Sequence, residues 1–265
     1  MKKFELTSEQ KINWFGHTLY RIKACISFTT TSGDEVNAGD LGGWVENEQN
    51  LSHDGKAWVC GDAEVWGNAE VCGDAEVWGN AEVCGDAKVW GNAKVWGNAK
   101  VCGDAKVWGN AEVCGDAKVW GNAEVCGDAE VCGDAKVCGD AKVCGDANIF
   151  STEHIFCVTP IGEYAQSLTL FRTKNCEIKI SFDLEIYDLD AFKEMVADWD
   201  DTKQREVALA ALELGQKHID LTPVEPENKP CPFCGGNAEY NPAPLKVVCT
   251  KCGASADKDV WNNRV

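Results

Sequence analysis

The chain has 265 residues, a formal net charge of −18 and 16 cysteines. This acidic balance argues against generic DNA or membrane binding, because a surface that binds phosphate groups needs a basic stripe. The N-terminus has no apolar stretch of signal-peptide length, and no window reaches the ~18 apolar residues of a membrane span. We therefore expect a cytoplasmic protein without membrane contact, whose thiols are mostly free because its compartment is reducing.

Residues 1–56 form a predicted N-terminal capping segment. The alternation in residues 19–26 predicts a strand, and the glycine-rich residues 39–45 predict a turn into a second strand. Val45 and Leu51 precede Ala57 by twelve and six residues, so the six-residue register begins imperfectly before the regular array. The terminal coil of a solenoid must cover its exposed core edge, and atypical sequence is expected there.

Residues 57–146 are fifteen consecutive hexapeptides of the form Ala-x-Val-x-Gly-(Asp/Asn). The Ala and the Val are two residues apart, so on a strand both side chains point to the same, inward side. Gly followed by Asp or Asn supplies a corner, because these residues tolerate positive φ. Three such sides make a coil of 18 residues. The pattern therefore predicts a three-sided parallel β-helix of five coils, within a predicted domain over residues 57–150.

Strict six-residue periodicity of this kind resembles the hexapeptide-repeat (trimeric LpxA-like) superfamily. The resemblance covers about a third of the chain, residues 57–146. It implies a single-stranded left-handed parallel β-helix. It also implies a homo-oligomer, with a trimer favoured.

Stacking by 18 residues arranges the outward Trp and Cys side chains of the array in three columns. Trp78 should then stack on Trp96, and Trp90 on Trp108. Exposed aromatic area usually marks an interface, so the first interpretation is burial against a neighbouring chain. The alternative is a set of platforms on which nucleobases or other planar ligands stack. The candidate ligand or interface residues are Trp66, Trp78, Trp90, Trp96, Trp108 and Trp120.

The same columns bring cysteines together in pairs. Soft-metal or redox chemistry is one interpretation of these pairs, and the other is that Cys serves as a small, weakly polar strand residue. The pairs are Cys84 with Cys102, Cys114 with Cys132, and Cys126 with Cys144.

Residues 151–220 are a predicted small α+β domain. Short alternating runs within residues 151–188 predict three or more antiparallel strands. Asp188 and Asp190 are candidate N-caps for a helix. The apolar positions assigned to this helix and to the one after it are Phe192, Met195 and Val196, then Val207, Ala210, Leu212 and Leu214. The proline-rich, charged residues 221–230 are a predicted linker.

Residues 231–265 contain two CxxC knuckles, Cys231/Cys234 and Cys249/Cys252, separated by fourteen residues. Each knuckle lets two thiolates reach one ion from a tight turn, and two knuckles complete a tetrahedral Zn²⁺ site. Redox use of either CxxC is the weaker alternative, because paired knuckles at this spacing are seldom redox dithiols. We therefore expect a C-terminal zinc ribbon that binds Zn²⁺ through all four cysteines.

The ribbon segment also resembles a known family. Its motifs are Lys229-Pro-Cys-Pro-Phe-Cys-Gly-Gly, Val248-Cys-Thr-Lys-Cys-Gly-Ala and the terminal Trp261-Asn-Asn-Arg. They are similar to the Lar-like restriction-alleviation family of phages and prophages, whose usual closing motif is Trp-Asn-Arg. The resemblance covers about 35 residues. It implies a protein that moderates host type I restriction, acts in the host cytoplasm and uses its ribbon to contact a host protein or nucleic acid.

Three functions are then open. The first is a non-catalytic phage or prophage binding protein in which the β-helix is a scaffold and the zinc ribbon a binding module; it assigns no catalytic residue. The second is a hexapeptide acyltransferase. Those enzymes generally need a catalytic His, yet residues 57–146 contain no His and no insertion, and His53 and His154 flank opposite ends of the array. The third is a protein that sequesters a nucleotide or another small molecule, contacted by the Trp side chains.

Overall fold

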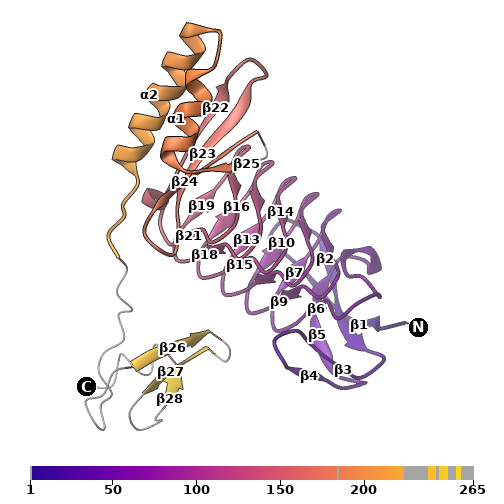
Figure 1. The fold of residues 1–265 in the computed structure, drawn as a ribbon. Helices are drawn as coiled ribbons and strands as arrows, with labels where there is room; N and C mark the ends of the chain where they lie inside the picture. The colour runs from indigo at the N-terminus through magenta and orange to yellow at the C-terminus, as the bar shows by residue number, and fades with distance from the viewer. Residues whose placement is uncertain (1, 184, 224–237, 243–244, 250–254, 258–265) are drawn as a thin grey trace. The chain divides into compact units, whose positions relative to one another are not determined.

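The computed structural model describes residues 2–183, 185–223, 238–242, 245–249 and 255–257, and side chains only up to residue 223. Their regular secondary structure is mainly β-strand, with two α-helices (Figure 1). The chain divides into two compact units, Met1–Leu221 and Thr222–Val265. Neither helix in the described part of the chain has the length and apolarity that crossing a membrane would require.

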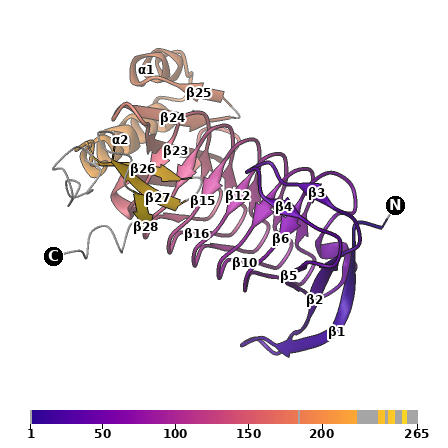
Figure 2. The same ribbon diagram turned by 90° about the horizontal axis from the view of Figure 1, so that it is seen from below.

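The hexapeptide array folds into a parallel β-solenoid, as predicted. Each unit contributes one two-residue strand, and every third strand pairs in parallel, so that Val83 aligns with Val65 on one side and with Val101 on the other. Successive strands therefore follow one another along three sheets (Figures 1 and 2). The strands are β6 (Trp58–Val59), β7 (Glu64–Val65), β8 (Glu70–Val71), β9 (Glu76–Val77), β10 (Glu82–Val83), β11 (Lys88–Val89), β12 (Lys94–Val95), β13 (Lys100–Val101), β14 (Lys106–Val107), β15 (Glu112–Val113), β16 (Lys118–Val119), β17 (Glu124–Val125), β18 (Glu130–Val131), β19 (Lys136–Val137), β20 (Lys142–Val143) and β21 (Asn148–Ile149).

The interior of the solenoid is made of the repeated Ala and Val side chains. Each of them is at most 1% exposed. Backbone amides join neighbouring coils at regular distances, for example Lys94 N to Ala111 O at 2.9 Å and Trp96 N to Val113 O at 2.9 Å. Since small and β-branched side chains suit a narrow interior and all of them are buried there, the repeat chemistry accounts for both the packing and the pairing of the coils.

The glycine at a corner that is followed by another coil has two functions. Gly97, for example, has φ of 74°, in the region that L side chains rarely adopt. A Cβ atom there would also lie 3.0 Å from the backbone N and O of Gly115 on the next coil. Only a residue without a side chain therefore allows the corners to stack at this spacing.

The N-terminal segment covers one end of the solenoid. Strand β1 (Phe4–Ile12) pairs antiparallel with β2 (Thr18–Ala24), and β2 pairs antiparallel with β5 (Leu41–Val45), which joins β7 in parallel. The predicted strand at residues 19–26 corresponds to β2, whereas β1 was not predicted. The short elements β3 (Phe28–Thr29), β4 (Glu35–Val36) and η1 (Glu48–Asn50) complete the segment.

The early register differs from the predicted one. Counting back from Ala57 placed Val45 and Leu51 in line with the alanines, but Val45 pairs with Val65 and Leu51 with Val71. Each pair is separated by 20 residues, compared with the 18 that separate Val59 from its partner Val77. The first coil therefore contains two extra residues. Because of them, Val45 and Leu51 align with the valines of the next coil and not with its alanines.

The other end of the solenoid is covered by a four-stranded antiparallel sheet. Its strands are β22 (Ile155–Ile161), β23 (Gln166–Arg172), β24 (Ile178–Phe182) and β25 (Glu185–Tyr187), preceded by η2 (Thr152–His154). Phe171 is fully buried in the solenoid core, and Ala147 forms a bridge with Thr173. The sheet therefore closes the last coil, and it confirms the predicted antiparallel strands.

Two helices pack on this sheet around a second core. Helix α1 (Leu189–Ala197) begins after Asp188, and α2 (Thr202–His218) begins after Asp201, whose side chain accepts a hydrogen bond from Gln204 N at 3.0 Å. The predicted apolar face of the second helix was wrong at three positions, because Val207, Ala210 and Leu214 are exposed. The buried face instead consists of Ala208, Ala211, Leu212 and Gly215, at the i, i+3, i+4, i+7 spacing of one helix face.

The smaller unit contains a three-stranded antiparallel sheet in its described part. Strand β27 (Leu245–Cys249) lies between β26 (Ala238–Pro242) and β28 (Ser255–Asp257).

Candidate functional site

The stacked Trp columns predicted from the 18-residue period are present. The rings of Trp78 and Trp96 lie 5.0 Å apart at an interplanar angle of 2°, and those of Trp90 and Trp108 lie 5.0 Å apart at 5°. Trp96 is only 8% exposed, and the other three rings are half-buried. Because ring stacking already covers much of the aromatic area, these side chains act first as ladders that join successive coils.

The two remaining candidate tryptophans have different surroundings. Trp66 is half-buried and its ring lies 5.1 Å from that of Phe15 and 4.6 Å from that of His17, both in the N-terminal cap. Trp120 is 36% exposed and has no aromatic partner among the described residues. The six candidate residues are therefore distributed over three columns and several environments, and they do not converge on one ligand site within the chain.

The corner residues form hydrogen-bonded ladders that follow the Trp columns. Apart from Trp58, every Trp of the array precedes Gly-Asn, and each of these Asn side chains donates to the Asp or Asn one coil further on, as Asn98 does to Asp116 at 3.0 Å. Cys always precedes Gly-Asp, so a stacked pair of cysteines is accompanied by a stacked pair of aspartates, such as Asp116 and Asp134. Two carboxylates cannot donate to each other, so these corners lack the amide ladder.

Two of the three stacked cysteine pairs are disulfides. Cys114 is bonded to Cys132 with a Cα–Cα distance of 4.5 Å, and Cys126 to Cys144 with a Cα–Cα distance of 4.6 Å. We expected mostly free thiols; eight described cysteines are free, but these four are not. Each disulfide lies beside an Asp-over-Asp corner and joins two coils where the amide ladder is missing.

The third pair, Cys84 and Cys102, is not bonded. The pKa of Cys84 is raised by its hydrogen bond with Cys102 and by burial, and the same hydrogen bond lowers the pKa of Cys102. The two thiols therefore lie within hydrogen-bonding reach of each other without forming a disulfide.

The four histidines all make structural contacts. His17 hydrogen bonds with Glu46 at 3.0 Å, and His53 stacks on Phe4 at 4.3 Å. His154 is buried, accepts from Phe150 N at 3.0 Å and has a lowered pKa because of burial. His218 contacts the carbonyl oxygen of Thr152 at 3.1 Å. These contacts place the imidazoles in the two end caps, outside the regular coils.

The predicted zinc ligands are not described at side-chain level. Cys231, Cys234 and Cys252 lie outside the described residues, and Cys249 is the last residue of β27. In the part of the chain that the structure describes, no group of three or more potential metal ligands comes together. The four-cysteine Zn²⁺ site therefore stays a prediction.

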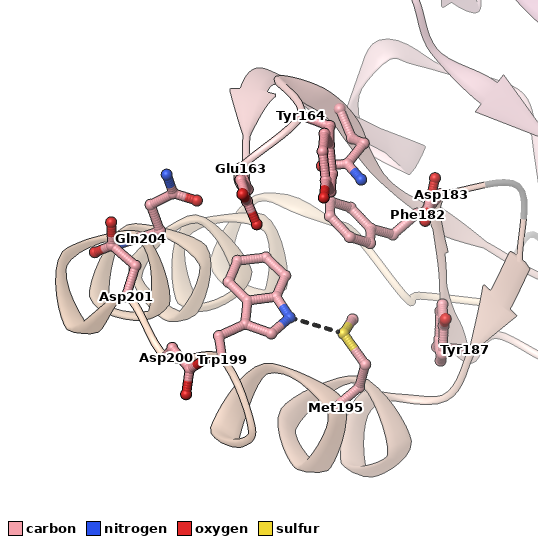
Figure 3. A pocket seen from close by; sticks show the side chains of 12 residues that line it. Glu163, Tyr164, Phe182, Asp183, Tyr187, Met195, Trp199, Asp200, Asp201 and Gln204 are labelled. Atoms are coloured by element: carbon pink, nitrogen blue, oxygen red, sulfur yellow. Dashed lines mark hydrogen bonds between the residues drawn. The ribbon is translucent and has the colours of Figure 1, made fainter.

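A cavity of about 670 Å³ lies in the α+β domain (Figure 3). It is bounded by the turn between β22 and β23, the ends of β24 and β25, helix α1 and the connection from α1 to α2. Its aromatic lining consists of Tyr164, Phe182, Tyr187 and Trp199, to which Met195 adds a thioether. The indole Nε1 of Trp199 donates to Met195 Sδ at 3.1 Å, which fixes the ring in the middle of the lining.

The charged lining of this cavity is acidic. Its carboxylates are Glu163, Asp183, Asp200 and Asp201, and the described lining includes no Lys, Arg or His. Gly162 has φ of 76°, and a Cβ atom there would lie 2.7 Å from Oε1 of Gln166, another lining residue, so glycine suits this position. The cavity therefore combines apolar walls with a local excess of negative charge, the arrangement of a small-ligand site with a few polar groups that fix orientation.

No protein-family model matches the chain, and no curated protein matches it.

The cavity was not predicted from the sequence. Its residues come from five separate segments of the aperiodic region, and no spacing rule links them. The available signal was compositional: residues 160–204 contain six aromatic residues, four of which line the cavity, near several acidic ones at or close to predicted strand and helix ends. Only the fold brings these side chains to one space.

Proposed function

We propose that the protein is a non-catalytic binding protein. In this proposal the β-solenoid is a rigid support, and binding takes place in the modules that follow it along the chain. The observation that carries the proposal is the contrast between a regular outer surface, formed by Trp, Asn and Cys ladders, and the acidic, aromatic cavity of the α+β domain. The coils present repeated, mutually satisfied side chains, whereas the cavity presents side chains that face open space.

Several parts of the proposal come from the sequence resemblances. They are a left-handed solenoid, a trimeric assembly, a Zn²⁺-binding ribbon that contacts a host protein or nucleic acid, and a phage-derived role against host restriction or defence. The two ends of the solenoid favour an assembly with a fixed number of chains over an open polymer. The cap strands cover one end, and Phe171 with its sheet covers the other. Covered edges prevent coil-on-coil polymerisation.

The acyltransferase alternative is tested by turnover. Purified protein is incubated with a panel of acyl-CoA thioesters and amine or alcohol acceptors, and released thiol is measured. We expect no release above background, because the histidines are occupied in the caps by Glu46, Phe4, Phe150 and Thr152. Robust turnover that disappears on His154→Ala would contradict the binding-protein proposal.

The sequestration alternative and binding in the cavity are distinguished by the small molecule that stays bound to the protein and by the variant that loses it. The protein is incubated with bacterial extract, washed and denatured, and the released small molecules are identified by mass spectrometry. Recovery of a nucleotide would favour sequestration at the Trp columns. Recovery of ligand that is lost on Trp199→Leu and kept on Trp120→Ala would support the cavity as the binding site.

The ribbon proposal is tested in the full chain. Metal analysis alongside native mass gives the zinc content per chain and the number of chains, for which we expect one Zn²⁺ per chain and a trimer. A plating assay with unmodified phage then compares the wild type with Cys231→Ser/Cys234→Ser. The matched control is Cys25→Ser, at an exposed free thiol. Restriction alleviation that is lost only in the double variant supports the proposal, and equal plating by all three proteins contradicts it.

A further inference from the structure

We infer that the cavity of the α+β domain binds a methylated ammonium group, that is, a cationic nitrogen that carries methyl substituents. This inference rests on the proposed binding function and names the ligand class of its site. It starts from three properties that occur together in one space: aromatic walls, carboxylates and room for a small organic group.

The walls suit an apolar cation. The rings of Phe182 and Trp199 lie 5.7 Å apart at 37°, so they form two inclined faces of the lining. Tyr187 lies further along the same lining and is supported by Phe192, 6.0 Å away. Tyr164 is 78% exposed at the turn between β22 and β23, where it can close over a bound group. A methylated nitrogen over such faces is attracted by the negative face of each ring, and best by Trp.

The charge of the lining suits a cation as well. Glu163, Asp183, Asp200 and Asp201 contribute four negative charges, and no cation in the described lining offsets them. Figure 3 shows Glu163 and Met195 near the Trp199 indole, at different edges of the ring in this view. These exposed carboxylates stand beside aromatic walls of low dielectric and give the cavity a negative potential, to which the overall charge of −18 adds.

Other ligand classes fit this lining less well. A nucleotide or another phosphate ester would bring anionic oxygens against four carboxylates. A bare Mg²⁺ or Ca²⁺ ion takes six or more oxygen ligands in a compact shell and makes no use of aromatic walls. A neutral planar molecule would use the rings but would leave the carboxylates without a partner. A methylated ammonium uses both components.

The ligand group could belong to a free small molecule or to a modified lysine side chain. Isothermal titration of the full-length protein therefore uses choline in one arm and a trimethyllysine peptide in another. The controls are 3,3-dimethylbutanol, the uncharged counterpart of choline, and the same peptide with unmodified lysine. We expect saturable binding of at least one methylated probe and more than tenfold weaker binding of its control.

Variants locate the binding site. Trp199→Leu should weaken binding more than tenfold, and Tyr164→Ala and Glu163→Gln each about threefold, in line with loss of one ring or one charge. Trp14→Ala and Glu206→Gln are the matched controls, since they remove an exposed ring and an exposed carboxylate away from the cavity. Circular dichroism verifies folding. Because Tyr164 and Glu163 are exposed, their variants remain informative even if Trp199→Leu fails to fold.

Three results would overturn the inference: no saturable binding of either methylated probe, equal binding of the uncharged control, or unchanged binding by folded Tyr164→Ala and Glu163→Gln variants. None of these results would overturn the binding-protein proposal, which depends on the retained-ligand and turnover experiments. Failure of the ligand class and failure of the function are therefore distinguishable.

Discussion

The solenoid and the α+β domain both have a core of buried apolar side chains, but the two cores are packed in different ways. In the solenoid, Ala and Val recur in register and pack at 0–1% exposure along the whole array. In the α+β domain the interior combines large side chains such as Phe182 and Phe192 with irregular turns, and it leaves a cavity of about 670 Å³ beside them. Repetition removes unfilled space, whereas irregular packing of large residues can retain a space shaped for a ligand.

The two regions also differ in what their outward side chains contact. Several outward side chains of the solenoid contact their counterparts on the next coil, such as the two Trp pairs and the Asn98–Asp116 pair, so that the outer surface contributes to stability. The side chains around the cavity face an open space, and their contribution is to recognition. We therefore expect changes in the solenoid to alter stability with little effect on ligand binding, and changes in the cavity to do the reverse.

In the solenoid, the largest expected loss of stability comes from removal of a disulfide. Each closes a loop with a sequence separation of 18 residues, so Cys114→Ser/Cys132→Ser should lower stability by about 3 kcal/mol under oxidising conditions. Thermal unfolding with and without a reductant measures the effect. The matched control is Cys84→Ser/Cys102→Ser, a stacked pair without the bond. An unchanged melting temperature of the wild type on reduction would contradict the predicted contribution.

The next largest loss of stability is expected from a change at a stacked glycine corner. Gly97→Ala should cost about 2 kcal/mol or more, because it adds backbone strain at positive φ and a contact with Gly115. Gly139→Ala is the matched control: its φ is also positive, at 67°, but a Cβ atom there meets nothing within 4 Å in the described chain. It should cost about 1 kcal/mol from strain alone. Equal destabilisation in chemical unfolding would show that corner stacking adds nothing.

A smaller effect is expected from ring stacking. A double-mutant cycle with Trp78→Ala and Trp96→Ala should give a coupling energy of about 1 kcal/mol, because the two rings lie parallel at 5.0 Å. The comparison pair is Trp78 with Trp120, which lie in different columns and should show additive changes. A coupling energy near zero for the stacked pair would indicate that these rings serve a partner chain instead.

A separate effect is expected at the N-terminal cap, where stability should depend on pH. Lys3 is 1% exposed, donates to Ala57 O at 2.8 Å, and has its pKa lowered by burial to about 8. Between pH 8 and its ordinary value of 10.5, the unfolded chain binds more protons at this site than the folded chain, so its contribution to stability rises with pH. The melting temperature of the wild type minus that of Lys3→Met should therefore increase over this range. A constant difference would show that Lys3 does not titrate there.

The periodic region was largely predictable from sequence because one local rule, repeated fifteen times, determines side-chain direction, corner and stacking partner. The Trp78–Trp96 and Trp90–Trp108 stacks follow from that rule. The first coil was mispredicted because two extra residues before Val59 cannot be located by counting. The exposed Val207 and Leu214 were misassigned because tertiary packing of Gly215 against Leu170 selects a different helix face.

The cavity was beyond sequence reasoning for a physical reason. Glu163 and Trp199 are 36 residues apart, and they meet only after a sheet and two helices have packed. The same limit applies to the disulfides. The period places each sulfur beside another, but sequence does not state which pairs are oxidised.

Removal of one complete coil tests most directly the claim that the solenoid supports and the α+β domain binds. Deletion of residues 93–110 removes 18 residues, preserves the register and leaves every cavity residue in place. Calorimetry should give this protein and the wild type the same affinity for the better methylated ammonium probe within about twofold, while Trp199→Leu binds more than tenfold more weakly. A coil-deleted protein that folds but no longer binds the probe would contradict the account and place recognition on the solenoid.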